Sequence, residues 1–150
     1  MRGALTIVSR PTTLPKDIQT AQAAGITTLI SLLEPTEAAT LGLATEADAC
    51  AAQGITFLNH PIRDMALPEF AAFRLFAEHI AARIRRGDHI ALHCRASIGR
   101  SGMLTCAILA HFGYDAQTAI AHVSKMRGTP VPDTAEQAAF IRKIMATSLL

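Results

Sequence analysis

The sequence has few aromatic residues. Its 150 residues include no tryptophan and one tyrosine, and aromatic residues make up 5% of the chain. Proteins that bind single-stranded nucleic acid stack bases on aromatic side chains and line their grooves with basic residues. A formal net charge of +2 provides no such basic surface. We therefore expect no nucleic-acid partner.

Long hydrophobic runs are also absent. Half of the residues are hydrophobic, yet no uninterrupted apolar stretch approaches the roughly 18 residues that a membrane-spanning helix needs. The start, MRGALTIVSRPTT, is apolar only briefly and lacks the small-residue cleavage site of an export signal. We expect no membrane partner and a cytoplasmic location.

Cysteine is scarce as well, with three residues far apart in the chain, Cys50, Cys94 and Cys106. Their odd number and wide spacing fit neither a disulfide framework nor the CxxC pairs of a zinc site, and they are typical of reduced thiols. The six histidines also lack ligand spacing. We expect no metal and no other cofactor, and we expect Cys50 and Cys106 to be core residues.

The chain does contain alternating strand and helix patterns over a length typical of a single domain, 1–150. Three runs are apolar on both faces, as buried parallel strands are: Ile26–Leu33, Gly54–Leu58 and His89–Leu92. Leu5–Val8 could add an edge strand. The predicted fold class is α/β, with a central, mainly parallel sheet of four to five strands flanked by helices.

Helical periodicity fills the remaining segments. The predicted helices are Pro15–Ala24, an interrupted Ala38–Ala52, Pro68–Arg86, Ser101–Phe112, Asp115–Arg127 and a last helix opened by DTAE at 133–136. Pro68 suits a first helical turn, and DTAE is close to a capping box. Parallel strands bring their carboxyl ends to one edge of the sheet, where ligand chemistry is expected.

One stretch, HIALHCRASIGRSGML at 89–104, reads as a strand, a tight loop and a helix. The backbone N–H groups of such a loop and the amino end of the helix form a site for an anion such as phosphate, sulfate or vanadate. The same field stabilises a thiolate on Cys94, which stands where the chain leaves the strand. The sequence therefore predicts a nucleophile inside an anion-binding loop.

The residues around Cys94 suit the handling of a phosphoryl group. Arg100 carries a planar fork of donors that matches two phosphate oxygens. Ser101 is within local reach of the Cys94 sulfur and can donate a hydrogen bond to it when a phosphocysteine intermediate is hydrolysed. We expect His93 to orient the loop rather than to exchange protons with substrate.

HCRASIGRSG resembles the HCx5R(S/T) signature of the cysteine-dependent protein tyrosine phosphatase superfamily, in its small dual-specificity-like branch. SRPTTL, AGITTLISLL, GITFLNHPIRDMALP and DTAEQAAFI also resemble segments of that branch, in its order. The resemblance implies a protein tyrosine phosphatase-like fold, Cys94 as nucleophile and Arg100 as phosphate clamp. It also implies an amide cradle that binds the phosphate, formed by Arg95, Ala96, Ser97, Ile98, Gly99 and Arg100.

The same resemblance implies a general acid upstream of the signature, and Asp64 in HPIRDMALPEF occupies that place. This loop follows a buried strand, so it lies at the same sheet edge as Cys94. Asp64 must be protonated in the first step and ionised in the second, when it activates water. Gln137 in DTAEQ resembles a glutamine that helps to place this water.

Two departures from the family pattern bear on rate and specificity. Ser97 stands where the family commonly has glycine, so either its backbone conformation accepts a side chain or the loop differs. The chain also lacks the tryptophan of the acid loop and the aromatic loop that deepen the pocket of phosphotyrosine-specific members. We therefore expect a shallower pocket.

Together these features predict a phosphatase that acts on a phosphorylated protein or a small phosphomonoester. Phosphotyrosine is a candidate group, as are phosphoserine and phosphothreonine. A catalytically weak phosphate-binding module and a rhodanese-like sulfurtransferase remain alternatives. The binding module needs neither a nucleophile nor an acid, and the sulfurtransferase needs no acid.

The arginines outside the signature have other expected positions. Arg63 is either solvated or in contact with an acidic substrate. Topology predicts that Arg83, Arg85 and Arg86 lie at the opposite end of the sheet from Cys94.

Overall fold

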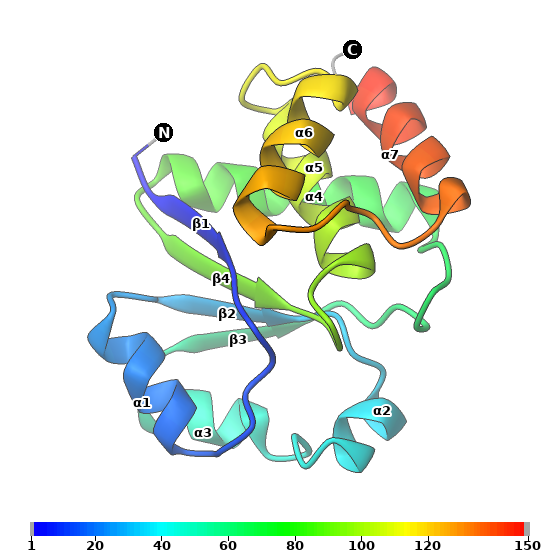
Figure 1. The fold of residues 1–150 in the computed structure, drawn as a ribbon. Helices are drawn as coiled ribbons and strands as arrows, with labels where there is room; N and C mark the ends of the chain where they lie inside the picture. Colours follow the sequence, from blue (N-terminus) through cyan, green and yellow to red (C-terminus); the bar gives the residue numbers. More distant parts are fainter. Residues whose placement is uncertain (1, 149–150) are drawn as a thin grey trace.

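The computed structural model describes residues 2–148 and contains one parallel sheet (Figure 1). Its strands are β1 (Ala4–Ile7), β2 (Thr28–Ser31), β3 (Thr56–Asn59) and β4 (His89–His93). They lie in the order β1-β4-β2-β3, and every neighbouring pair is parallel. The predicted parallel sheet is confirmed at four strands, with β1 as the expected edge strand.

Helices cover both faces of this sheet (Figure 1). They are α1 (Lys16–Ala23), α2 (Pro35–Thr40), α3 (Glu46–Ala52), α4 (Phe70–Arg85), α5 (Gly99–Ala110), α6 (Ala116–Arg127) and α7 (Ala135–Ser148). The interrupted helix predicted over Ala38–Ala52 is therefore two separate helices, and α2 begins three residues earlier than expected. No helix within residues 2–148 has both the length and the apolar character needed to cross a bilayer.

Capping side chains decide where two of the helices begin. The predicted start of α4 at Pro68 is wrong, because the Glu69 carboxylate accepts the N–H groups of Ala71 and Ala72 and the helix begins at Phe70. The capping box of α7 lies one residue later than predicted, between Thr134 and Gln137.

In this box the Thr134 hydroxyl accepts the N–H of Gln137 at 3.0 Å. The Gln137 Oε1 in turn accepts the N–H of Thr134 at 3.3 Å and that of Asp133 at 3.0 Å. Asp133 and Glu136, the ends of the predicted box, are not its members. The reciprocal bonds follow the usual Ser/Thr-x-x-Glu/Gln arrangement.

Two apolar clusters hold the layers together, one on each face of the sheet. There are two because side chains along each strand point alternately to opposite faces. Leu29 and Ala91 pack with Ile18 of α1 and Cys50 of α3. Ile30, Ile90 and Leu92 face the opposite way and join the larger cluster with α4, α5 and α7. The central strands are thus buried on both faces, which explains their continuous apolar sequences.

The parallel arrangement brings three segments to one edge of the sheet, after the carboxyl ends of β2, β3 and β4. The Asn59 side chain donates hydrogen bonds to the carbonyl oxygens of Ser31 and Leu33, which ties the end of β3 to the segment that follows β2. At the other edge, Arg83 contacts Asp88 and Thr28 beside the starts of β4 and β2. This part of the predicted arginine cluster therefore lies away from Cys94, as the topology predicts.

Candidate active site

His93, the last residue of β4, is fully buried and lies between two acceptors. Its Nε2 is 2.6 Å from a carboxylate oxygen of Glu46, and its Nδ1 is 3.3 Å from the carbonyl oxygen of Cys94. Glu46 belongs to α3 and is also buried, with 2% exposure. His93 therefore connects helix α3 to the backbone of the nucleophile loop, an arrangement that fits the orienting role expected from the sequence.

The loop at 94–98 is held by the segment that follows β1. Ser97 has a left-handed backbone, with φ of 58°, and its hydroxyl donates a 2.7 Å hydrogen bond to the carbonyl oxygen of Val8. The Arg10 guanidinium donates a 2.6 Å hydrogen bond to the carbonyl oxygen of Arg95. The first of the two sequence-based alternatives for Ser97 is therefore correct: its backbone conformation is one that glycine favours, and it carries a side chain that anchors the loop.

Helix α5 begins at Gly99, two residues before the predicted start at Ser101, so its first turn belongs to the loop. A Cβ atom on Gly99 would meet the carboxylate of Asp133 first and would lie 2.9 Å from Oε1 and 3.1 Å from Nε2 of Gln137. The segment that opens α7 thus packs closely on the loop, and a side chain at position 99 would displace the Asp133 or Gln137 side chain. Cys94 is a free cysteine with 2% exposure.

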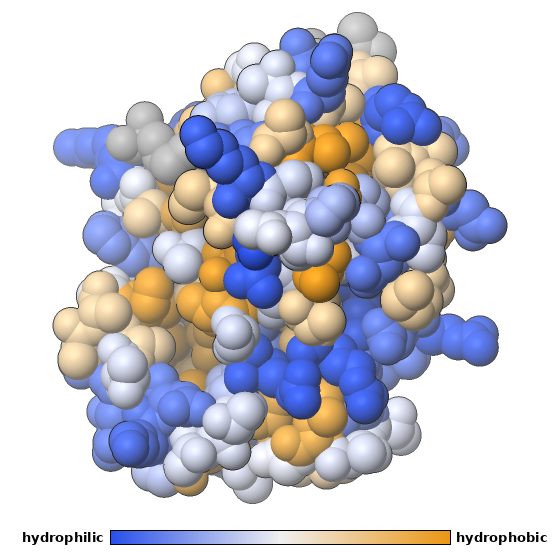
Figure 2. All heavy atoms as spheres, viewed as in Figure 1, coloured by the Kyte–Doolittle hydropathy of each residue, from blue (hydrophilic) through white to orange (hydrophobic). Residues whose placement is uncertain are grey.

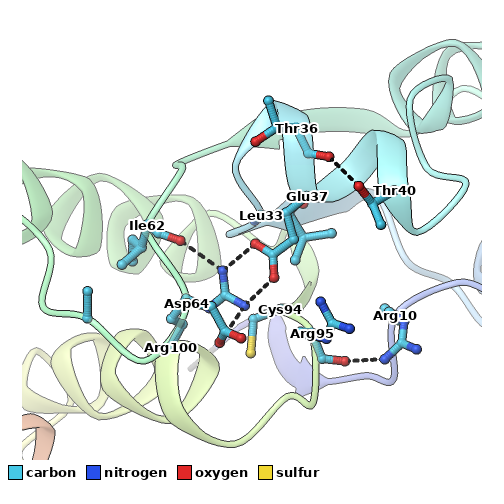
Figure 3. Close-up of polar contacts among 12 residues, drawn as sticks. Arg10, Leu33, Thr36, Glu37, Thr40, Ile62, Asp64, Cys94, Arg95 and Arg100 are labelled. Carbon is cyan, nitrogen blue, oxygen red and sulfur yellow. Dashed lines mark hydrogen bonds and ion pairs between the residues drawn. The ribbon is translucent and has the colours of Figure 1, made fainter.

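Arg100 is buried, and four of its five N–H groups are engaged (Figure 3). Glu37 accepts two of them at 2.7 and 2.8 Å, the Ile62 carbonyl oxygen accepts one at 2.8 Å, and Asp64 accepts one at 3.0 Å. The Arg100 Nε and the Ser101 Oγ are buried without a hydrogen-bond partner among the described residues. Two donors beside the loop are therefore free for a bound anion.

Glu37 is a site residue that the sequence analysis missed. It lies on α2, directly after the segment that follows β2, and its carboxylate binds Arg100 in a bidentate pair. Hydrogen bonding to Arg100 holds the pKa of Glu37 below its ordinary value. Burial opposes the charge on Arg100, but the hydrogen bonds to Glu37 and the nearby charge of Cys94 raise its pKa. The sequence did contain one indication of this role: Glu37 follows a buried strand whose carboxyl end lies at the same edge of the sheet as Cys94.

Asp64 lies at the same edge of the sheet as Cys94, as the sequence predicts, and the structure adds a 3.0 Å contact with Arg100. Its side chain is 46% exposed, so it borders both the buried guanidinium and solvent. The next residue, Met65, has a left-handed φ of 63°. Gln137 Nε2 donates to the carbonyl oxygen of Ala66 at 3.4 Å, which links the Asp64 loop to α7.

A surface hollow of about 330 Å³ adjoins these residues, and we refer to it as the α2 hollow. Polar side chains line it throughout: Glu34, Thr36, Glu37, Thr40, Arg63, Asp64 and Arg95. Figure 2 shows hydrophilic residues gathered between the turn after β4 and helix α2 in the same view as Figure 1. None of the residues that line the hollow is aromatic, and neither Cys94 nor Arg100 is part of the lining, so the shallow pocket expected over Cys94 stays a prediction.

Solved structures of phosphatases have the same fold. Kinase associated phosphatase, with serine in place of its catalytic cysteine, superposes with a TM-score of 0.89 at 18% identity, over 96% of this chain and 86% of the other. The active form of Tk-PTP gives 0.82 at 23% identity over 96% and 92% of the two chains. Human DUSP28 gives 0.68 at 18% identity over 95% and 92%.

A comparison with curated protein sequences found no significant match. In contrast, residues 1–150 match the family model described as "Swiss Army Knife protein, DSP-PTPase phosphatase domain". The match spans the strand, loop and helix that carry Cys94 and Arg100. The chain therefore belongs to this family of dual-specificity-type protein tyrosine phosphatase domains and is a cysteine-dependent phosphatase.

Proposed function

We propose that the chain hydrolyses phosphomonoesters through a phosphocysteine intermediate on Cys94. The Cys94 thiolate attacks phosphorus, an S–P bond forms, and the ester P–O bond breaks as Asp64 protonates the leaving oxygen. In the second step ionised Asp64 takes a proton from water, whose oxygen attacks phosphorus. The S–P bond breaks, and orthophosphate and the Cys94 thiolate are released.

The observation that carries this proposal is the hydrogen bonding of Arg100. Glu37 and Ile62 fix the guanidinium beside the loop, while the Arg100 Nε remains unpartnered. A donor held in place before the reaction stabilises charge on the transferring phosphoryl group without reorganising. Ser101 Oγ is the second free donor and serves the Cys94 sulfur as it departs.

The contact between Asp64 and Arg100, at 3.0 Å, supports the role of Asp64 as the acid, because its carboxyl group borders both the phosphate clamp and solvent. Gln137, which lies between Ala66 and Gly99, is proposed to help place the attacking water.

Hydrolysis of para-nitrophenyl phosphate tests the mechanism, with the parent protein, Cys94→Ser, Asp64→Ala and the exposed control Asp48→Ala measured together. We expect Cys94→Ser to lose turnover by at least about a thousandfold. Asp64→Ala should lose turnover of para-nitrophenyl phosphate by about tenfold to a hundredfold. The loss should be larger with an alkyl phosphate, because an alkoxide needs the proton to leave whereas nitrophenolate leaves readily without it. Asp48→Ala should match the parent protein.

Other outcomes identify the alternatives. Equal turnover by Cys94→Ser and the parent protein would exclude the phosphocysteine mechanism. Binding of vanadate with no turnover under reducing conditions would indicate a phosphate-binding module. Full sulfur transfer from thiosulfate by Asp64→Ala would indicate a sulfurtransferase, since that chemistry needs no acid at this position.

A further inference from the structure

A cavity of about 280 Å³ lies between β1, α5 and α6, and we refer to it as the β1 cavity. In Figure 1 it belongs to the edge of the sheet, where β1 lies beside α6. No residue of the Cys94 loop is part of its lining, and neither is Asp64. Pockets for drug-sized ligands measure about 300–1,000 Å³, so this cavity suits a smaller molecule.

The walls of the β1 cavity are mainly apolar. Leu109 of α5 and Val123 of α6 are almost fully buried, and Leu5 and Ile7 of β1 are half-buried. Met126, which also lines the cavity, is 74% exposed, more than any other large hydrophobic side chain within residues 2–148. Methionine is common on surfaces that adapt to a ligand, and an apolar ligand in this cavity would shield these side chains from water.

The lining carries positive charge without a counterion. Arg127, the last residue of α6, is half-buried, and its guanidinium has no hydrogen bond or ion pair with any other described residue. The lining contains one further side chain that can become positive, His122, and no carboxylate. A half-buried guanidinium beside apolar walls is stabilised by an anionic group that pairs with it.

Strand β1 adds backbone donors at the same place. Ala4 and Val8 donate their N–H groups toward β4. Because bonding to one neighbour alternates along a strand, the N–H groups of Leu5 and Ile7 face the open edge of the sheet. Both residues line the cavity, and both N–H groups lack a partner within the described part of the chain. A polar group at this edge therefore finds donors from the backbone as well as from Arg127.

We propose that the β1 cavity binds a small carboxylate with an apolar body. The carboxylate pairs with the Arg127 guanidinium, and the apolar body packs against the β1 side chains and Val123, beneath Met126. A single unpaired guanidinium matches the two oxygens of one carboxylate. The apolar walls disfavour a ligand with several charges. This site is separate from the catalytic loop, so the proposal does not depend on the proposed phosphatase function.

Octanoate is the probe for this site. Isothermal titration calorimetry would compare it with octanamide, which has the same body without the charge, and with acetate, which has the charge without the body. We expect octanoate to bind with a Kd below about 1 mM and the other two to bind at least about tenfold more weakly, because the charged contact and the apolar burial each provide that much. Equal affinity for octanoate and octanamide, or no saturable octanoate binding up to about 10 mM, would overturn the inference.

Variants assign the binding to these residues. Arg127→Gln should weaken octanoate binding by at least about tenfold and leave octanamide binding unchanged. Met126→Ala should weaken both ligands by a similar factor, since it removes only apolar contact. Arg142→Gln, an exposed arginine of α7, is the control and should bind octanoate as the parent protein does. Octanoate affinity that survives Arg127→Gln would contradict the proposed site.

Vanadate separates the β1 cavity from the catalytic loop. Saturating vanadate should leave octanoate binding unchanged, because no residue of the Cys94 loop lines the cavity. Displacement of octanoate by vanadate would mean that the carboxylate binds the catalytic loop, and it would overturn the inference. Absence of para-nitrophenyl phosphate turnover in the parent protein would instead overturn the proposed function and leave the octanoate result unaffected.

Discussion

At the scale of the residue, Ser97 combines backbone strain with a compensating hydrogen bond. A left-handed conformation costs a residue other than glycine roughly 1–2 kcal/mol, and the hydrogen bond to the Val8 carbonyl oxygen offsets about 1 kcal/mol of it. The Ser97 hydroxyl therefore stabilises a loop conformation that would otherwise be unfavourable for a residue with a side chain.

Substitutions at Ser97 should separate these two effects. We expect Ser97→Ala, which keeps the strain and loses the hydrogen bond, to lower the free energy of unfolding in urea by about 1–2 kcal/mol. Ser97→Gly loses both and should stay within about 1 kcal/mol of the parent protein. If alanine proved as stable as serine, the hydrogen bond to Val8 would contribute nothing to the fold.

Glu37 should make stability depend on pH. Its pKa is lowered in the folded protein by Arg100, so the pair stabilises the fold above the ordinary glutamate value of 4.5, and this contribution is lost as the pH falls through the lowered value. We expect Glu37→Gln to be less stable than the parent protein by about 1–3 kcal/mol at pH 7. The difference should narrow in urea unfolding below pH 4.5.

The exposed Glu78→Gln provides the control and should show no such pH-dependent difference. A gap between Glu37→Gln and the parent protein that stayed constant from pH 7 into the acid range would mean that the ion pair with Arg100 does not cause it.

At the scale of the element, α3 supports the active edge through one buried carboxylate. Both ring nitrogens of the buried His93 lie beside oxygen atoms, of Glu46 and of the Cys94 carbonyl, so loss of Glu46 leaves a buried ring nitrogen without its partner. We expect Glu46→Ala to lower the free energy of unfolding by about 3–5 kcal/mol. Glu46→Gln should cost less, because its carbonyl oxygen can still accept.

Turnover distinguishes support of the loop from support of the fold alone. Because His93 connects Glu46 to the backbone of Cys94, Glu46→Ala should lower kcat for para-nitrophenyl phosphate under conditions where the protein stays folded, and Glu46→Gln should retain more of it. Unchanged kcat with only reduced stability would limit Glu46 to a structural role.

The amino end of α7 shows how element boundaries carry function. The sequence pattern predicts a cap near Asp133, whereas Thr134 and Gln137 form the box. The one-residue difference matters because it turns Gln137 toward both the acid loop and Gly99. Asp133 and Thr134 are both residue types that cap helices, so local preference allows the helix to begin after either one. Packing of Gln137 against the nucleophile loop favours the observed cap at Thr134.

At the scale of the whole molecule, all three cysteines are buried, but Cys50 and Cys106 lie in the apolar clusters on opposite faces of the sheet, outside the loop that carries Cys94. Burial raises the thiol pKa of Cys50 to about 11, with a further contribution from Glu46, and that of Cys106 to about 12. Both are core residues, as the sequence predicts.

Thiol labelling should report this difference. We expect iodoacetamide to modify Cys94 first in the folded protein and vanadate to slow that reaction, because only Cys94 lies in the anion loop. All three cysteines should react in urea. Mass spectrometry of peptides gives the order, and modification of Cys50 or Cys106 as fast as Cys94 in the folded protein would contradict it.

Local pattern was enough to determine the layered α/β fold and the strand–loop–helix signature around Cys94. It also placed Asp64 at the same sheet edge, because runs of apolar residues identify parallel strands and such strands end together. Tertiary structure alone decided that Glu37 and Glu46 serve the site. Arg100 meets Glu37 from 63 residues away, His93 meets Glu46 from 47, and Ser97 meets Val8 from 89. These contacts depend on the strand order β1-β4-β2-β3, which hydrophobic periodicity does not specify.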